Sequence, residues 1–466
     1  MLKNASRTDV IWGYAAQLLN VGAGMLLLPF SLRYLNSEEL GLWYVFIALA
    51  GLAQLLEFGF QPTIARQTAY VYSGVQALTA TGLPIGKTDS VNFHLLADLI
   101  AAARSVYRLV AFGAACILFG GGSIYLYTLT TKTLTPAAAV LPWLVYATGA
   151  VLNLYYAYFN GLLQGRGEQT VANRMMAASR SVMLVLSIPL LVSGFGLMGL
   201  AVGSLGSAIA NRILINRAFF NPDKPETAFF KRHPGNAKTL YTILWNSAWR
   251  MGVVQLGAFM ILRANLFIAT SFVGLAAAAS YGLSLQLLTL LSTMSTLLFT
   301  LQMPKMNALQ ASGDKEALKS VFSSAVMLSW GIFVVGTLGL VFVGIPVLSV
   351  WRSNTTLMPL PWLVLLSVIL LLEMNHALSA MYITTLNHVP FVPAAVFSGL
   401  GIVLIGMLFV SCTKLGIGGL LIAQGMVQLT YNNWKWPAAA LKHLHLNPIS
   451  FYKYGRNGLS RVFGNP

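Results

Sequence analysis

Charged residues, acidic residues and cysteines are all scarce in this chain. Only 9% of its 466 residues are charged and 57% are hydrophobic, whereas a soluble domain carries about 25% charged residues. The two cysteines, Cys116 and Cys412, lie in separate apolar runs, so neither a disulfide framework nor a CxxC metal site is available. The composition excludes a soluble globular protein and indicates an integral membrane protein.

Nucleotide-binding loops are missing as well. Residues 82–88 (GLPIGKT) are one residue short of the phosphate-binding pattern GxxxxGK[ST], and no strand precedes them. Residues 194–199 (GFGLMG) fit GxGxxG but join two apolar runs, where a dinucleotide-binding fold cannot form. We expect no cofactor, no metal and no catalytic group, so any work must draw on an ion gradient or on mass action.

Long apolar runs dominate what is present. A helix needs about 20 mostly apolar residues to cross about 30 Å of hydrocarbon, and about twelve stretches meet that length. The sequence therefore predicts an all-α polytopic membrane protein. The expected spans are roughly 10–34, 41–62, 106–128, 137–160, 180–196, 197–216, 240–263, 278–303, 321–343, 359–384, 392–411 and 415–437.

Lysine and arginine concentrate in alternate loops. With the N-terminus in the cytoplasm, most of the 29 basic residues face the cytoplasm, as the positive-inside rule requires. Two others, Arg250 and Arg263, fall inside a span. Four basic residues face outwards, namely Arg33, Lys132, Arg352 and Lys414. This asymmetry explains the net charge of +17 and predicts an even number of spans with both termini cytoplasmic.

A polar stretch near the middle divides the chain into six spans plus six. We expect an N-lobe over residues 1–220, a cytoplasmic linker over 221–238, a C-lobe over 239–437 and a basic cytoplasmic tail over 438–466. Transporters built this way often hold their substrate between the halves, near the bilayer midplane.

Two arginines in the seventh span are the first candidates for function. Arg250 lies about eleven residues into its span, one turn after Asn246, and Arg263 follows close to the outer interface. A charge at the bilayer centre costs at least about 2.5–3.5 kcal/mol, and Arg binds phosphate oxygens bidentately. The pattern suits a phosphate-bearing substrate. The alternatives are a structural ion pair for Arg250 and outward snorkelling for Arg263.

Acidic groups inside spans are the candidates for ion coupling or gating. Glu373 and His376 share one face of the tenth span and form a candidate proton-coupling pair. A cluster of hydrogen bonds between helices is the alternative. Glu57, near the cytoplasmic end of the second span, and Arg66 beyond it form a candidate gate, with an interfacial salt bridge as the alternative for Glu57.

Uncharged amides recur within the spans. Such side chains either join helices by hydrogen bonds or contact sugar hydroxyls where they line a cavity. As candidate substrate contacts we take Gln17, Asn20, Asn153, Gln286 and Gln424.

The tail after the last span interleaves basic and aromatic residues, from Lys435 to Arg461. RNA-binding peptides have a similar composition, but a tail that leaves a membrane favours anionic phospholipid headgroups at the cytoplasmic face. We therefore expect no nucleic acid as partner.

The opening spans carry a family pattern. The segment 32–44 (LRYLNSEELGLWY), the stretch 55–60 (LLEFGF) with Glu57 and Gly59, and Arg66 together resemble O-antigen and polysaccharide (Wzx-type) flippases. These flippases belong to the multidrug/oligosaccharidyl-lipid/polysaccharide (MOP) exporter superfamily. Residues 161–167 (GLLQGRG) and Gly199 are similar to the same family. Glu57 replaces the Asp that is commoner there.

The resemblance implies two lobes that open alternately to each side of a bacterial inner membrane. It also implies a cationic cavity, ion-driven exchange and an undecaprenyl-diphosphate-linked oligosaccharide as substrate. A polysaccharide polymerase and a chain-length regulator would be downstream partners. Two alternatives stay open: a drug/cation antiporter of the same superfamily, and a membrane-embedded glycosyltransferase or polymerase, for which no acidic catalytic loop is found.

Overall fold

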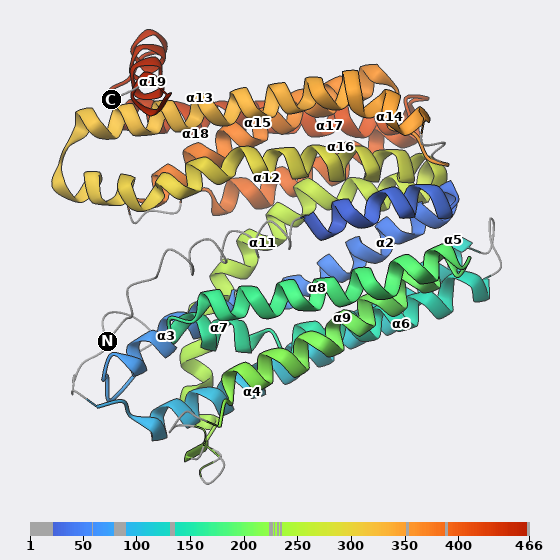
Figure 1. Ribbon diagram of the computed structural model, residues 1–466. Coiled ribbons are helices and arrows are strands. Elements are labelled where there is room, and N and C mark those ends of the chain that lie inside the picture. Colours follow the sequence, from blue (N-terminus) through green and yellow to red (C-terminus); the bar gives the residue numbers. More distant parts are fainter. Residues whose placement is uncertain are drawn as a thin grey trace. The chain divides into compact units, whose positions relative to one another are not determined.

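The computed structural model describes residues 22–57, 59–78, 90–130, 136–222, 227, 229–230, 233, 235–350, 354–386 and 390–463. Within these residues the chain is helical and forms no β-strand (Figure 1). Packing divides it into two compact units, Met1–Leu256 and Gly257–Pro466. The boundary falls inside one helix, α11 (Lys238–Phe272), whereas the linker expected from the sequence is residues 221–238, and that linker stays a prediction.

The described part of the chain contains nine helices that are long and apolar enough to cross a membrane. A tenth candidate is the bent pair Gln255–Ile261 and Arg263–Phe272 within α11, whose two parts differ by 43°. The first expected span is described only from residue 22, where residues 22–34 are helical. The last is broken into two shorter helices. The predicted all-α polytopic fold is confirmed, and a count of twelve spans is compatible with these helices.

Unit 1 consists of helices that pack mainly against their sequence neighbours. α8 and α6 both pack along α9, and α3 packs against α7. Large aromatic side chains fill its core, among them Phe46, Phe60, Tyr107, Trp143 and Tyr158. Its helices before α11 are α2 (Ser37–Gln54), η1 (Leu55–Glu57), α3 (Phe60–Tyr72), α4 (Phe93–Ala115), η2 (Cys116–Gly122), α5 (Ser123–Thr130), α6 (Pro136–Tyr155), α7 (Tyr158–Gly165), α8 (Gln169–Val192) and α9 (Gly196–Phe219).

The segment 32–44, which resembles the flippases, contains the start of α2. Asn36 caps α2 by accepting a hydrogen bond of 2.8 Å from the backbone N–H of Glu39, and the Glu39 carboxylate accepts one of 3.0 Å from the N–H of Asn36. This reciprocal capping box satisfies backbone donors that a helix start leaves unpaired. The polar residues between the first two spans therefore fix where the second span begins.

The segment 161–167, which also resembles the flippases, lets α3 and α7 approach each other closely. A methyl group added to Gly165 of α7 would collide with the carbonyl oxygen of Ala65 and with Thr68 on α3. Arg166, next in the chain, pairs with Glu168 at 2.6 Å and donates a hydrogen bond of 3.2 Å to the carbonyl oxygen of Phe219. Because a helix end leaves its last carbonyl groups without partners, Arg166 also caps α9.

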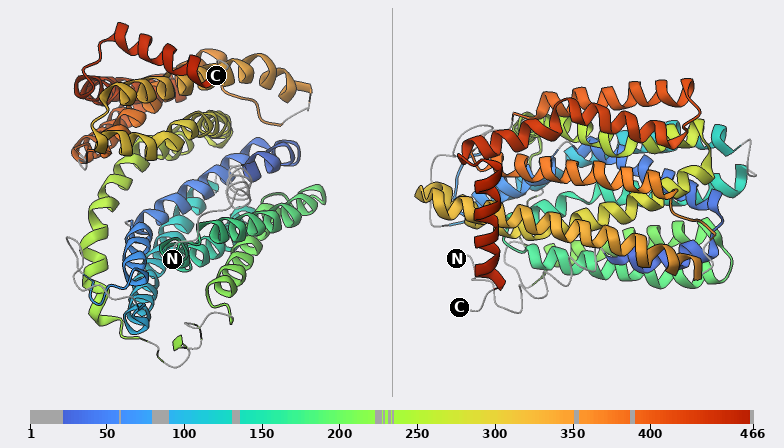
Figure 2. Two further views of the ribbon diagram at one scale, coloured as in Figure 1. Left: turned by 60° about the vertical axis from the view of Figure 1, so that its left-hand side comes forward. Right: turned by 90° about the horizontal axis from the view of Figure 1, so that it is seen from above.

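Unit 2 has the same style of packing in α12 (Leu275–Ser312), α13 (Lys315–Gly339), η3 (Leu340–Gly344), α14 (Ile345–Val350), α15 (Leu360–Thr384), α16 (Val392–Cys412), α17 (Ile417–Thr430), α18 (Asn432–His443) and α19 (Pro448–Phe463). α12 packs on α13, α16 on α17, and α15 on α18. α19 runs across the direction of the other helices of this unit (Figure 2). It contacts α13 through Gly455 and Gly458, where an added methyl group on Gly458 would lie 3.0 Å from the carbonyl oxygen of Ser320.

The third and the ninth spans differ from those expected from hydropathy. α4 begins at Phe93, thirteen residues before the expected span, because Asn92 caps it with a 3.0 Å hydrogen bond from the N–H of Leu95. Hydropathy marks only the part of a helix that is apolar, not the polar turns that precede it. The third and ninth spans also contain π-helical turns, η2 and η3, which periodicity does not reveal.

Candidate functional site

Unit 2 contains a buried acidic side chain held by amides. Glu373 of α15 is 7% exposed, and its Oε1 accepts hydrogen bonds from Gln424 Nε2 at 2.8 Å and Gln428 Nε2 at 3.5 Å, both on α17. Gln424 Oε1 in turn accepts a 2.8 Å hydrogen bond from Asn265 Nδ2 of α11. One carboxylate thus joins three membrane helices through a chain of amides, and burial away from water strengthens each of these bonds.

The network continues towards the break between α17 and α18. Asn432 donates to Gln428 Oε1 and to Ser398 Oγ, each at 2.8 Å, and Trp436 Nε1 donates to Asn432 Oδ1 at 3.0 Å. Tyr431, with φ −145° and ψ −62°, interrupts the helix next to these side chains. The last predicted span is therefore divided at a polar layer.

Glu373 and His376 bind separate partners. His376 Nδ1 lies 3.0 Å from Asn433 Oδ1, whereas the described hydrogen bonds of Glu373 go to α17. No hydrogen bond or ion pair joins the two residues, and no Lys or Arg of the described chain pairs with Glu373. The assignment of both to ion coupling stays a prediction.

Both hydrogen bonds to Glu373 end on Oε1, and none from the described residues reaches Oε2. A carboxylate in apolar surroundings is costly unless it binds a proton or a cation. The described residues contain no group of three or more His, Cys, Asp or Glu side chains that could hold a metal ion.

Unit 1 holds a second acidic group, among aromatic rings. Glu57, at the end of η1, accepts a 2.8 Å hydrogen bond from the hydroxyl of Tyr107 on α4. The Tyr107 ring packs against Phe60 and Tyr158, with centroids 6.4 and 5.9 Å away. Gly59, two residues after Glu57, is the N-cap of α3 and has φ 76°. Glycine adopts this left-handed conformation without strain. The Glu–x–Gly pattern thus positions a carboxylate at a break between two helices.

Arg66 does not contact Glu57. It is exposed on α3, and no ion pair links the two side chains. Among the described residues, the side chain that bonds Glu57 is the hydroxyl of Tyr107. The gating role of both residues stays a prediction.

The other predicted residues are dispersed. Gln424 lies in the buried network, Gln286 is half-buried on α12, and Asn153 is exposed on α6. Arg263 is half-buried on α11, close enough to the buried Tyr281 for an electrostatic interaction. Four candidates cannot be placed: Gln17 and Asn20 lie outside the described residues, and so do the side chains of Asn246 and Arg250, whose backbone is helical in α11.

Tyr107, Asn265 and Asn432 are functional candidates that sequence reasoning missed. Asn265 carries an available signal, because an amide within an apolar span usually has a partner. Tyr107 carries none, since tyrosine is common at membrane interfaces and nothing in its spacing points to Glu57.

No family model matches the chain, and no curated protein does. Solved structures do. An inward-facing multidrug resistance MATE family transporter of the MOP superfamily aligns with 97% of this chain and 96% of its own, with a TM-score of 0.70 and 14% identity. The chain has the fold of the MOP superfamily transporters.

Two further structures of this superfamily show the same likeness. An outward-facing multidrug resistance MATE family transporter covers 96% of this chain and 95% of its own, with a TM-score of 0.54 and 15% identity. The other is a MOP superfamily transporter from Pyrococcus furiosus, which is described as having a binding pocket of reverse polarity that suggests a different function. It covers 98% of this chain and 97% of its own, with a TM-score of 0.55 and 15% identity. All three structures are described as transporters, and this chain shares their fold.

Proposed function

We propose that this chain is a flippase that moves undecaprenyl-diphosphate-linked oligosaccharide, an O-antigen or related repeat unit, from the cytoplasmic to the periplasmic leaflet of a bacterial inner membrane. The two units open alternately to either side, and an ion gradient drives the cycle. A polysaccharide polymerase and a chain-length regulator act on the product.

The position of Arg250 carries this proposal. It stands twelve residues after the start of α11, which corresponds to about 18 Å of helix. A cation at that depth within an apolar helix of a transporter fold favours an anionic substrate, since a cationic one would be repelled. Arginine matches the diphosphate of a lipid-linked sugar, because its planar group donates two parallel hydrogen bonds to phosphate oxygens.

Glu373 supports the coupling part of the proposal. Its described partners are neutral amides, so a proton or a monovalent cation can bind there and leave without breaking an ion pair. Movement of α11, α15 or α17 alters the bonds that the other two helices make with this group, which links ion binding to helix position.

A drug/cation antiporter is the second candidate. The buried carboxylate of Glu373 favours it, and so does the description of one similar structure as a multidrug resistance transporter. Purified protein in vesicles distinguishes the two. A flippase exposes a fluorescent lipid-linked oligosaccharide to an impermeant quencher on the opposite leaflet, and an antiporter accumulates a fluorescent organic cation.

The decisive variant is Arg250→Ala. In cells that depend on this chain for surface polysaccharide, we expect Arg250→Ala to abolish the polysaccharide while the protein stays in the membrane, and Arg250→Lys to do so in part. The matched control is Arg180→Ala, which removes an exposed arginine of α8. Normal polysaccharide with Arg250→Ala would contradict a phosphate-binding role for this residue.

A further inference from the structure

A cavity of about 700 Å³ lies in unit 2 where the turn from α12 to α13 meets the turn from α18 to α19. Four of its eight lining residues are basic or can become so, namely Lys315, Lys442, His443 and His445, and none is acidic. Cationic side chains repel one another, so a cavity that gathers four of them is suited to an anion.

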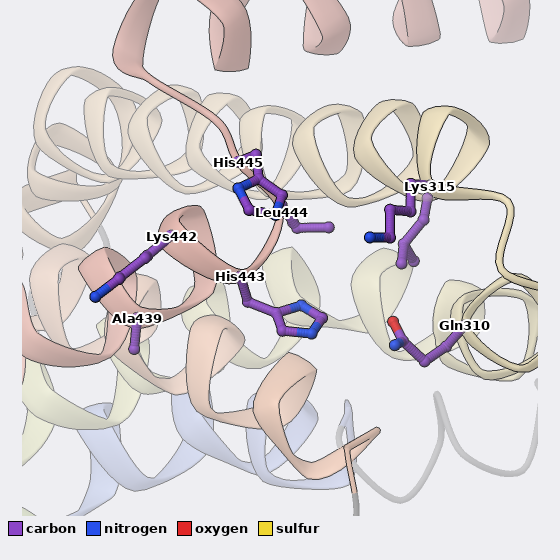
Figure 3. A pocket seen from close by; sticks show the side chains of 8 residues that line it. Gln310, Lys315, Ala439, Lys442, His443, Leu444 and His445 are labelled. Carbon is purple, nitrogen blue, oxygen red and sulfur yellow. The ribbon is translucent and has the colours of Figure 1, made fainter.

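Three of the lining side chains point into a common space. Figure 3 shows the ammonium group of Lys315, the ring of His443 and the amide of Gln310 directed towards one another from three separate segments, while Lys442 points away. Burial, followed by the charges of Lys315 and His445, lowers the pKa of His443. An anion between these groups would cancel the repulsion.

Hydrogen bonding identifies the kind of anion. The hydroxyl of Tyr382 on α15 lies 2.8 Å from His443 Nδ1. When that hydroxyl donates, the ring carries its proton on Nε2, which becomes a donor to a ligand. The buried oxygen Oε1 of Gln310 has no hydrogen-bond donor among the described residues. A phosphate ester that carries a hydroxyl group fits these residues, because its phosphate oxygens accept from Lys315 and from His443 Nε2 and its hydroxyl donates to Gln310.

Nearby carboxylates are already engaged. Glu316 accepts hydrogen bonds from Lys319 Nζ at 2.8 Å and from the hydroxyl of Tyr454 at 2.5 Å. Asp314 caps α13 by accepting a bond from the N–H of Ala317 at 3.0 Å. Neither acid lines the cavity, so the cavity keeps its positive potential.

The cavity lies beyond the apolar stretch of α12. The span expected from the sequence ends at residue 303, seven residues before Gln310, and Lys305 lies between them. α19 runs across the other helices of unit 2 (Figure 2) and exposes Ile449, Tyr452 and Lys453. A crosswise helix with exposed apolar and basic residues lies in the plane of the headgroups.

We propose that this cavity binds a phosphate diester or monoester that carries hydroxyl groups, with Lys315 and His443 contacting the phosphate and Gln310 accepting from a hydroxyl. Two sources have this chemistry. One is the headgroup of an anionic lipid such as phosphatidylglycerol, and the other is a free glycerol phosphate. The site is separate from Glu373 and Glu57, and because Tyr382 belongs to α15, the same helix as Glu373, occupancy acts on the helix that carries the buried acid.

Binding to the full-length purified protein tests the proposal without any transport measurement. Short-chain phosphatidylglycerol, glycerol 3-phosphate and short-chain phosphatidylcholine are titrated separately while thermal unfolding and native mass are recorded. We expect phosphatidylglycerol, glycerol 3-phosphate or both to bind and raise the unfolding temperature, and phosphatidylcholine to have no effect. Binding of phosphatidylglycerol but not of glycerol 3-phosphate identifies the ligand as a lipid headgroup. Glycerol 3-phosphate that binds as tightly as phosphatidylglycerol identifies the ligand as the free ester.

Two variants locate the site. Lys315→Gln removes one charge-assisted contact and is expected to weaken binding about tenfold or more, and His443→Asn keeps a polar atom towards Tyr382 but removes the second ring nitrogen. The control, Lys453→Gln, removes the same charge from the exposed face of α19 and should change binding less than about threefold. Equal weakening by Lys315→Gln and Lys453→Gln, or no binding of either ester, overturns the proposal and leaves the proposed transport function untouched.

Discussion

Gln424 donates its side-chain N–H to Glu373 at 2.8 Å while its own carbonyl oxygen accepts from Asn265 at the same distance. A single amide on α17 therefore connects a carboxylate on α15 to an amide on α11. Because the amide cannot turn over without breaking both bonds, it fixes the direction in which Glu373 presents Oε1 and leaves Oε2 for another partner.

Glu373→Gln should uncouple transport from the ion gradient. Glutamine keeps an oxygen for Gln424 to donate to but carries no charge, so the helices should stay together while proton or cation binding is lost. In vesicles, we expect the rate to become independent of the imposed gradient. The control Glu316→Gln, an exposed acid of the same unit, should keep the dependence. An unchanged response in Glu373→Gln would make this residue structural.

Tyr107→Phe should destabilise unit 1. It removes the hydroxyl that donates to Glu57 and leaves a partly buried carboxylate without that donor, at a cost of about 1–3 kcal/mol. Thermal unfolding in detergent measures the loss. Tyr127→Phe, which alters an exposed tyrosine, should cost less than about 0.5 kcal/mol. In a Glu57→Gln background the effect of Tyr107→Phe should shrink, and an undiminished effect would mean that the hydroxyl stabilises something else.

Gly165→Ala should also destabilise unit 1, because the new methyl group meets the carbonyl oxygen of Ala65 and Thr68 across the contact of α3 with α7. Overpacking of this kind costs about 1–3 kcal/mol. Gly331→Ala is the matched substitution, since its methyl group meets nothing within 4 Å on α13. That variant should be neutral or more stable by up to about 1 kcal/mol. Equal unfolding temperatures for the two variants would exclude close packing as the reason for the glycine.

The attachment of α18 and α19 should weaken as pH falls. The folded protein lowers the pKa of His443 below its ordinary value of 6.5, through burial and the charges of Lys315 and His445. A histidine with a lowered folded pKa contributes its stability above the unfolded pKa, and that contribution is lost as pH drops through the folded value. Hydrogen exchange of α19, corrected for intrinsic rates, should be faster at pH 5.5 than at pH 7.5. His443→Asn should remove most of the difference, and a difference that persists would assign it to other groups.

Hydropathy predicted the all-helical architecture because the bilayer allows few kinds of backbone structure. Every backbone group in hydrocarbon needs an internal partner, so apolar runs of the right length become helices. Asn92 is a residue type that often caps helices, but hydropathy marks only the apolar part of the helix that follows it. Breaks such as Tyr431 follow from packing between helices, which one sequence does not display.

The candidate site was predicted in part. Glu373 stood out because buried acids are rare in membranes, and Gln424 because its amide lies in an apolar run. Their mutual contact did not stand out, since it joins residues 51 positions apart. The same holds for Glu57 and Tyr107, where the predicted partner was a cation and the observed one is a neutral hydroxyl.

The two π-helical segments change which way the ends of two long helices face. η2 begins at Cys116, 23 residues after the start of α4, and η3 begins at Leu340, 25 residues after the start of α13. A π-turn holds one residue more than an α-turn, so it records an insertion within a helix. Each of these two helices therefore rotates its remaining residues relative to an uninterrupted α-helix. The side chains after Gly122 and Gly344 face directions that the period of 3.6 residues, counted from the start of the helix, does not give.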